Sequence, residues 1–81
     1  MKVKVRFFAA SREAMGTGEI EQEIPPGSTV EELMTLLANE YPALRPYARL
    51  IKVAVNRQYA APETELREGD EVACLPPVGG G

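Results

Sequence analysis

The sequence predicts a single α+β domain in which a mixed sheet packs on one main helix. Three patterns support this: two alternating apolar and polar segments near the start, one apolar stripe at helical spacing in the middle, and two further alternating segments in the second half. With 81 residues, of which 44% are hydrophobic and 26% charged, the chain can build one small core and has no room for a second.

The first two strands are expected to form a hairpin. Residues 2–8 alternate between apolar and charged side chains, which predicts a strand. One helical turn is expected over residues 11–15, with Ser11 as its N-cap. Residues 19–24 alternate again, and three glutamates share one face, as is typical of an edge strand protected by like charge.

The main helix is expected to begin near Ser28 and to end before Pro42. Ser28 and Glu31 have the spacing of a capping box, in which each side chain bonds a free backbone N–H. Pro42 ends the helix because the residue before a proline avoids the α region. Between these limits an apolar stripe recurs at steps of three and four residues: Val30, Leu33, Met34, Leu37 and Tyr41.

The remaining strands come from the second half of the chain. Residues 51–56 alternate and predict a strand that ends in a turn at residues 56–57, whereas segment 43–50 fits no element. Residues 71–75 predict a last strand, which two prolines at residues 76–77 bring to an end. Two strands, a helix, a strand, a gap and a final strand are the order of a ubiquitin-like β-grasp fold.

Composition and charge exclude several classes of function. The net charge of -3 disfavours binding to phosphate backbones, so we expect no nucleic-acid partner. The absence of a long apolar run and of a secretory signal leads us to expect no membrane association and a cytoplasmic location. With no histidine and a single cysteine, Cys74, we expect no bound metal or cofactor, and Cys74 is in phase with Val72 as a core residue.

The residues after the last strand are the candidates for chemistry. Pro76 and Pro77 have a fixed φ and no N–H, so they are expected to leave the sheet as an extended strut. Gly79, Gly80 and Gly81 lack Cβ and can enter a channel too narrow for side chains. We therefore divide the chain into a β-grasp domain, 1–77, and a flexible tail, 78–81. The residues alone leave open whether the tail is a reactive end or a frayed one.

An exposed face of the predicted sheet is a second candidate region. Phe8 and Leu75 fall opposite the core positions of their strands, so they form part of either a docking surface or an ordinary surface with scattered apolar residues. The basic residues of the same face are either solvated or opposite an acidic partner: Lys2, Lys4, Arg6 and Lys52.

Several short motifs, in a characteristic order and over nearly the whole length, link the chain to a known family. They are Phe7-Phe8-Ala9, Arg12-Glu13, Thr29-Val30, Val55-Asn56, Gly69-Asp70-Glu71-Val72-Ala73 and Pro76-Pro77-Val78. With these motifs the chain resembles the MoaD/ThiS family of ubiquitin-like sulfur carriers, and within it the carriers of molybdopterin synthase.

The resemblance implies a non-catalytic carrier subunit whose reacting group is the carboxylate of Gly81. An E1-like, MoeB-like adenylyltransferase would use MgATP to form an acyl-adenylate, and a sulfurtransferase would supply the sulfur of a thiocarboxylate. The tail, with Gly79 and Gly80, would then enter a MoaE-like large subunit of a heterotetramer and donate sulfur to cyclic pyranopterin monophosphate in molybdenum cofactor biosynthesis. The partner interface would include Phe8, Arg12, Leu75, Pro76, Pro77 and Val78.

Chemistry and fold leave three alternatives beside this function. The chain has no histidine and no cysteine near Gly81 that could convert its carboxylate into a leaving group, so activation requires a partner in any case. The same activated end would serve a carrier for thiamine synthesis or tRNA thiolation, or a ubiquitin-like modifier that forms isopeptide bonds with lysines. A β-grasp interaction module with an inert tail is the third alternative.

Overall fold

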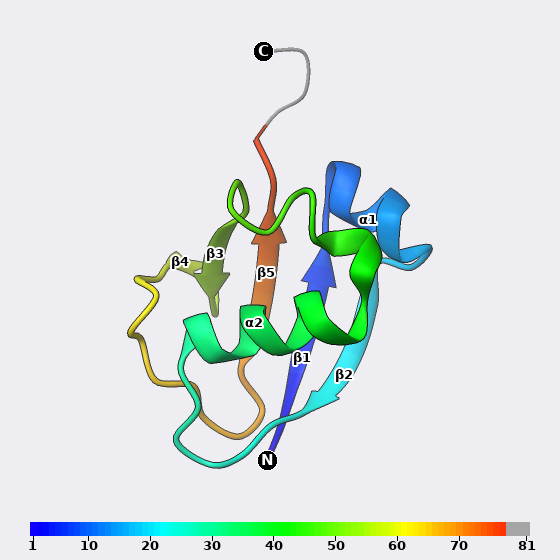
Figure 1. The fold of residues 1–81 in the computed structure, drawn as a ribbon. Helices are drawn as coiled ribbons and strands as arrows, with labels where there is room; N and C mark the ends of the chain where they lie inside the picture. Colours follow the sequence, from blue (N-terminus) through cyan, green and yellow to red (C-terminus); the bar gives the residue numbers. More distant parts are fainter. Residues whose placement is uncertain (78–81) are drawn as a thin grey trace.

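The computed structural model describes residues 1–77, and the predicted tail residues 78–81 lie outside the described part. Five strands form one mixed sheet in the order β2-β1-β5-β3-β4, with α2 lying across it (Figure 1). The elements are β1 (Lys2–Phe7), α1 (Ala9–Met15), β2 (Glu19–Glu23), α2 (Val30–Glu40), the short 3-10 helix η1 (Pro42–Leu44), β3 (Lys52–Val55), β4 (Gln58–Tyr59) and β5 (Glu71–Leu75). The predicted β-grasp fold is confirmed.

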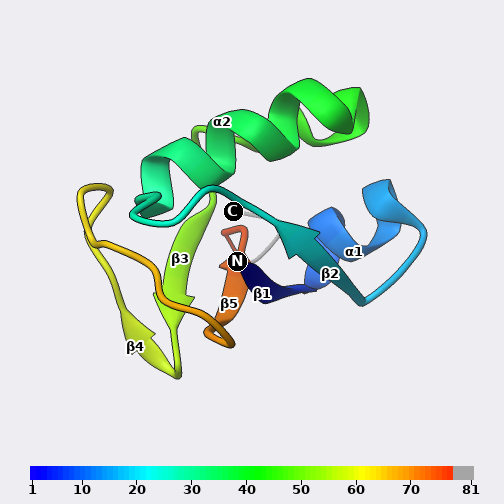
Figure 2. The ribbon, with the colours of Figure 1, turned by 90° about the horizontal axis from the view of Figure 1, so that it is seen from below.

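The two central strands come from opposite ends of the chain. β1 pairs with β5 in parallel, from Lys4 opposite Glu71 to Phe7 opposite Cys74, while every other neighbouring pair is antiparallel. Figure 2 shows α2 on one face of this sheet and no helix across the other. In the described part of the chain, no helix is long and apolar enough to cross a membrane.

The core lies between α2 and the inner face of the sheet. The predicted alternation places one side of β1 and β5 inward, where α2 covers it with its apolar stripe. Fully buried side chains from these three elements include Val3, Val5, Phe7, Leu33, Leu37, Val72 and Cys74. Burial of a side chain of this size contributes about 1.5–3 kcal/mol, so this layer is what holds the sheet to the helix.

The first helix begins earlier than the sequence predicts. Ser11 is not the N-cap; that position is taken by Phe8, and the helix runs from Ala9. The Ser11 hydroxyl donates to the Phe8 carbonyl over 2.7 Å and accepts from the Phe8 N–H over 3.2 Å. A serine can bond the backbone either from the N-cap, by accepting from an N–H of the first turn, or from the third helical position, by bonding the N-cap residue, so its presence did not determine the start.

The capping box of α2 is displaced by one residue from the predicted pair. Thr29 is the N-cap: its hydroxyl accepts from the Glu32 N–H over 3.2 Å, and the Glu32 carboxylate accepts from the Thr29 N–H over 2.9 Å. Ser28 instead donates to the carbonyl of Pro25 over 2.6 Å. Serine and threonine are adjacent here, as are two glutamates, so both pairs have the required spacing.

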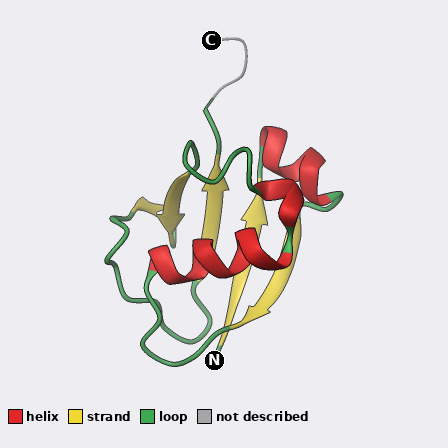
Figure 3. Ribbon diagram, in the orientation of Figure 1, coloured by secondary structure: helices red, strands yellow, loops and turns green. Residues whose placement is uncertain are grey.

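Two elements of the second half were not predicted. The turn at residues 56–57 is confirmed, but it leads into β4, which has only two residues and is too short to show alternation. The segment between β4 and β5 forms loops and turns (Figure 3), yet it buries Leu66 in the core. Segment 43–50, which fitted no element, contains the end of η1, where Leu44 is buried.

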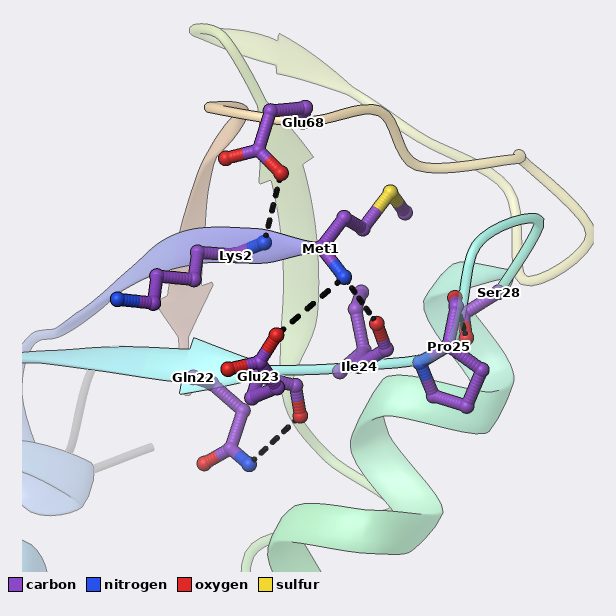
Figure 4. A network of polar contacts seen from close by, with 8 residues as sticks. All are labelled: Met1, Lys2, Gln22, Glu23, Ile24, Pro25, Ser28 and Glu68. Atoms are coloured by element: carbon purple, nitrogen blue, oxygen red, sulfur yellow. Dashed lines mark hydrogen bonds and ion pairs between the residues drawn. The ribbon is translucent and has the colours of Figure 1, made fainter.

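The start of β1 is held on two sides by polar contacts (Figure 4). The Met1 amino nitrogen donates to the carbonyl of Ile24 over 2.8 Å and lies 3.5 Å from the carboxylate of Glu23. On the other side, the Lys2 N–H donates to the Glu68 carboxylate over 3.0 Å. These contacts join β1 both to the end of β2 and to the connection that precedes β5.

Candidate functional site

The strand that leads to the tail occupies the middle of the sheet. β5 is hydrogen-bonded to β1 on one side and to β3 on the other, and it ends at Leu75, where Lys52 is its partner on β3. Pro76 is half-buried and Pro77 exposed after the strand, at the end of the molecule opposite Met1 (Figure 1). The predicted tail residues, Val78, Gly79, Gly80 and Gly81, lie outside the described residues. The direction in which the chain leaves the sheet is set by two neighbouring strands.

A set of hydrogen bonds fixes the opposite end of β5. The Asn56 amide donates to the Asp70 carboxylate over 2.9 Å, and its oxygen accepts from the Glu71 N–H over 3.0 Å. The second Asp70 carboxylate oxygen accepts from the Arg67 N–H over 2.8 Å. Asn56 and Asp70 belong to motifs named in the sequence analysis, and their role here is structural: they set the register in which β5 enters the sheet.

The uncovered face of the sheet carries a shallow hollow beside the tail exit. One row of directly paired residues crosses this face from β1 to β4: Arg6, Ala73, Ala54 and Tyr59. The hollow has a volume of about 350 Å³, and its lining adds Phe8, Leu75, Arg57 and Glu71 to this row. Small alanines therefore lie between larger side chains, and the resulting depression can accept a protruding side chain of another protein. We call these eight residues the docking face.

The structure brings together only part of the predicted interface. Phe8, 37% exposed, and Leu75, half-buried, both line the docking face, although Phe8 does so as the N-cap of α1 and not as a strand residue. Arg12 does not join them. It lies on α1, and its side chain is next to Gly18: a residue with a Cβ at position 18 would bring that atom to 3.4 Å from the Arg12 Nε. Pro76 and Pro77 follow β5 without lining the hollow.

Tyr59 is a member of the docking face that the sequence analysis missed. Its side chain is 77% exposed, and it is brought opposite Ala54 by the hairpin of β3 and β4. Aromatic side chains with this much exposed area are enriched in protein interfaces, because they bury a large surface at a small entropic cost. The available signal was an aromatic residue two positions after a predicted turn, in a segment assigned to no element.

Two basic side chains on the uncovered face, Lys4 and Arg6, are paired with glutamates. Arg6 lies 4.0 Å from Glu19 and 3.7 Å from Glu71, and its guanidinium is 5.4 Å from the centre of the Phe8 ring. Lys4 also contacts Glu19, at 3.9 Å. Exposed ion pairs of this kind contribute little to stability, but they orient Arg6 beside Phe8. Glutamates of β2 and β5 thus compensate Lys4 and Arg6, whereas Lys2 and Lys52 form no side-chain ion pair with any residue from 1 to 77.

Cys74 is confirmed as a core residue. Its side chain is fully buried, and burial raises the pKa of the thiol from 9.0 to about 12. Because the thiolate is the reactive form, this environment suppresses the reactivity of the sulfur. Within residues 1–77 no group of three or more histidine, cysteine, aspartate or glutamate side chains is arranged to hold a metal ion.

We expect Cys74 to react with iodoacetamide at pH 8 at least about a hundredfold more slowly in the folded protein than in the urea-unfolded chain. The raised pKa keeps the thiol protonated at this pH, and burial blocks the reagent. The time course of alkylation by mass spectrometry measures both rates. Equal rates would contradict the assignment of Cys74 to the core and would indicate an accessible, reactive thiol.

Comparisons with known proteins agree with these features. The chain is 37% identical to the molybdopterin synthase sulfur carrier subunit of Chlamydomonas reinhardtii, with 100% of both chains covered, and 42% identical to that of Mycobacterium tuberculosis, with 100% of this chain and 99% of the other covered. Among solved structures, it superposes on a putative molybdopterin converting factor subunit 1 from Pyrococcus furiosus with a TM-score of 0.86, at 32% identity, over 96% and 99% of the two chains.

Two further solved structures bear on partners and on alternatives. One is the complex of subunits 1 and 2 of the molybdopterin-converting factor from Helicobacter pylori, with a TM-score of 0.74, 28% identity and 100% of both chains covered. The other is H. volcanii small archaeal modifier protein 1, with a TM-score of 0.83, 26% identity and coverage of 95% and 98%. The family model described as ThiS matches residues 5–81. The chain therefore belongs to the ThiS family.

Proposed function

We propose that this chain is the sulfur-carrier subunit of a molybdopterin synthase. The observation that carries the proposal is the match over full length to two sulfur carrier subunits of that enzyme, at 37% and 42% identity. In this role the chain is not itself the catalyst. It presents a sulfur atom to a partner that holds the active site.

The proposed reacting group is the carboxylate of Gly81. A carboxylate is a poor acyl donor until one oxygen becomes a leaving group. An E1-like adenylyltransferase would join that oxygen to the α-phosphorus of MgATP and release pyrophosphate. A sulfurtransferase would deliver sulfur at the sulfide oxidation level, and this nucleophile would attack the acyl carbon and displace AMP, leaving a thiocarboxylate. Gly79 and Gly80 would allow the reacting end to approach the nucleotide closely, since they carry no side chains.

The docking face is the surface on which we propose that the large subunit binds. Phe8, Tyr59 and Leu75 provide apolar area around a depression, and this area adjoins the strand that leads into the tail. The complex of subunits 1 and 2 from Helicobacter pylori supports an assembly of this kind. A carrier held by this face would direct residues 76–81 toward the partner, where sulfur would pass to cyclic pyranopterin monophosphate. We propose a cytoplasmic heterotetramer.

A second function is supported by the likeness to small archaeal modifier protein 1. A modifier would use the same acyl-adenylate, but an amine of a lysine would attack it in place of sulfur. The domain and tail would then be unchanged and the product an isopeptide bond. A carrier for thiamine synthesis or tRNA thiolation differs only in the acceptor of the sulfur.

The intact mass of the protein isolated from its own cells separates these functions. We expect a population in which one oxygen of the chain is replaced by sulfur, and which reverts to the free acid after incubation with the large subunit and cyclic pyranopterin monophosphate. A cell extract that contains only the free acid and lysine-linked adducts would instead favour the modifier. Loss of the sulfur to a thiazole precursor or a tRNA, and not to the pterin, would identify one of the other carriers.

A further inference from the structure

We propose that Arg57 is a specificity-determining residue of the docking face. It binds a carboxylate of the partner, and an apolar side chain of the partner next to that carboxylate fills the hollow. This inference rests on the proposed function, because the partner is the molybdopterin synthase large subunit. It adds the chemistry that this subunit must present: an aliphatic or aromatic side chain with a neighbouring aspartate or glutamate.

The backbone of Arg57 is the first observation. Asn56 has φ 50° and Arg57 has φ 71°, so both residues of the turn between β3 and β4 are left-handed. Two-residue hairpin turns of this type favour asparagine at the first position and glycine at the second, because a Cβ at positive φ is strained. Arginine at the second position therefore makes the turn less stable than glycine would. Strained residues of this kind cluster at functional sites.

The surroundings hold this turn in place. The Asn56 N–H donates to the carbonyl of Glu71 over 2.8 Å, and the Asn56 side chain bonds both Asp70 and the Glu71 N–H. The turn is thus tied to the start of β5, which is itself in the centre of the sheet. Arg57 extends from a rigid base, so its guanidinium does not need to order a mobile loop when it binds.

The charges that line the hollow are the second observation. They are Arg6, Arg57 and Glu71. Arg6 is shared between Glu71 and Glu19, whereas Arg57 forms no ion pair with any residue from 1 to 77. One edge of an apolar depression therefore carries an uncompensated guanidinium. Its complement is a carboxylate, which guanidinium groups bind through two parallel hydrogen bonds.

The apolar part of the hollow sets what must accompany that carboxylate. Ala54 and Ala73 form its floor, and Phe8, Tyr59 and Leu75 stand around them. A partner side chain without apolar atoms would leave this area in contact with water, while a buried aliphatic or aromatic group would fill it. A partner surface with an apolar residue next to an acidic one thus matches both the apolar floor of the hollow and Arg57 at its edge.

Calorimetric titration of the purified full-length carrier with the large subunit of the same organism tests the proposal. Arg57→Gln is expected to weaken binding about 10- to 100-fold and to reduce its dependence on salt. Arg67→Gln is the matched control, because it removes the same charge from a residue that does not line the hollow. This control is expected to bind as tightly as the parent.

A second variant distinguishes docking from folding. Arg57→Gly relieves the strained turn, so it is expected to raise the thermal midpoint of unfolding while binding as weakly as Arg57→Gln. A purely structural arginine would not give opposite signs for stability and binding. Binding of Arg57→Gln within twofold of the parent would overturn the role of Arg57 and leave the proposed function standing. No binding by the parent carrier would overturn the proposed partner, and this inference with it.

Discussion

Removal of Gly80 and Gly81 is expected to abolish formation of the thiocarboxylate without lowering stability. The shortened chain still ends in a glycine carboxylate, that of Gly79, but this group is displaced by about 7 Å along an extended chain. A displacement of this size removes the carbonyl carbon from the position at which adenylation occurs, so product should fall below about a thousandth of the parent level. The core ends at Cys74, which explains why the thermal midpoint should be unchanged.

The measurement is a reconstitution with the E1-like enzyme, MgATP and a sulfur source, followed by intact mass and by the thermal midpoint. Gly81→Val is the companion variant, because it keeps the length and adds only side-chain volume. Adenylation of Gly81→Val at the parent rate would refute the narrow channel, though not the reactive end. Thiocarboxylate on the shortened chain at the parent rate would refute the assignment of Gly81 and favour an inert tail.

Alanine substitutions of the adjacent residues Phe7 and Phe8 should have different effects, the first on stability and the second on docking. Phe7→Ala is expected to lower the free energy of unfolding by about 3–5 kcal/mol, because the ring is fully buried between β1 and α2 and its loss leaves a cavity. Phe8→Ala should change that free energy by less than about 1 kcal/mol, since Ser11 bonds only backbone groups of Phe8. Its effect should fall on docking, with affinity for the large subunit reduced about tenfold or more.

Urea denaturation measures the first effect and calorimetric titration the second. The start of α1 should be preserved in Phe8→Ala, because Ser11 bonds the backbone N–H and carbonyl of residue 8 and not its side chain. A loss of several kcal/mol in Phe8→Ala would show that the ring is part of the core. Unchanged affinity in the same variant would remove Phe8 from the docking face.

The sequence predicted those helices and strands in which the alternating or helical pattern of apolar residues repeats more than once. β1, β5 and α2 have alternation or a helical stripe over five or more residues, and their observed bounds are close to the predicted ones. Adjacent residues with equal capping ability explain the displaced start of α2 at Thr29. β4 has two residues and no period, so its existence depends on the turn before it and on pairing with β3.

The docking face was predictable only in part, because the register in which the strands pair determines which residues lie side by side on it. Leu75 could be assigned to the outer face by counting along β5, and Phe8 by continuing the alternation of β1 one residue past its end. The hollow between them also needs Ala54 and Ala73 to lie opposite each other, which depends on how β3 and β5 pair. The partners of Arg6 likewise became evident only when Glu19 and Glu71 were placed on either side of it.

The parallel pairing of β1 with β5 has a consequence for the order of events during folding. Its contacts join the two ends of the sequence, and β3 has no partner toward the centre of the sheet until β5 is present. Contacts of such long sequence separation form late, because a large loop must first close. A partly synthesised or truncated chain therefore cannot complete the sheet. A large subunit that binds the docking face as proposed would therefore find this surface only on a finished domain, because its lining includes residues of β3, β4 and β5.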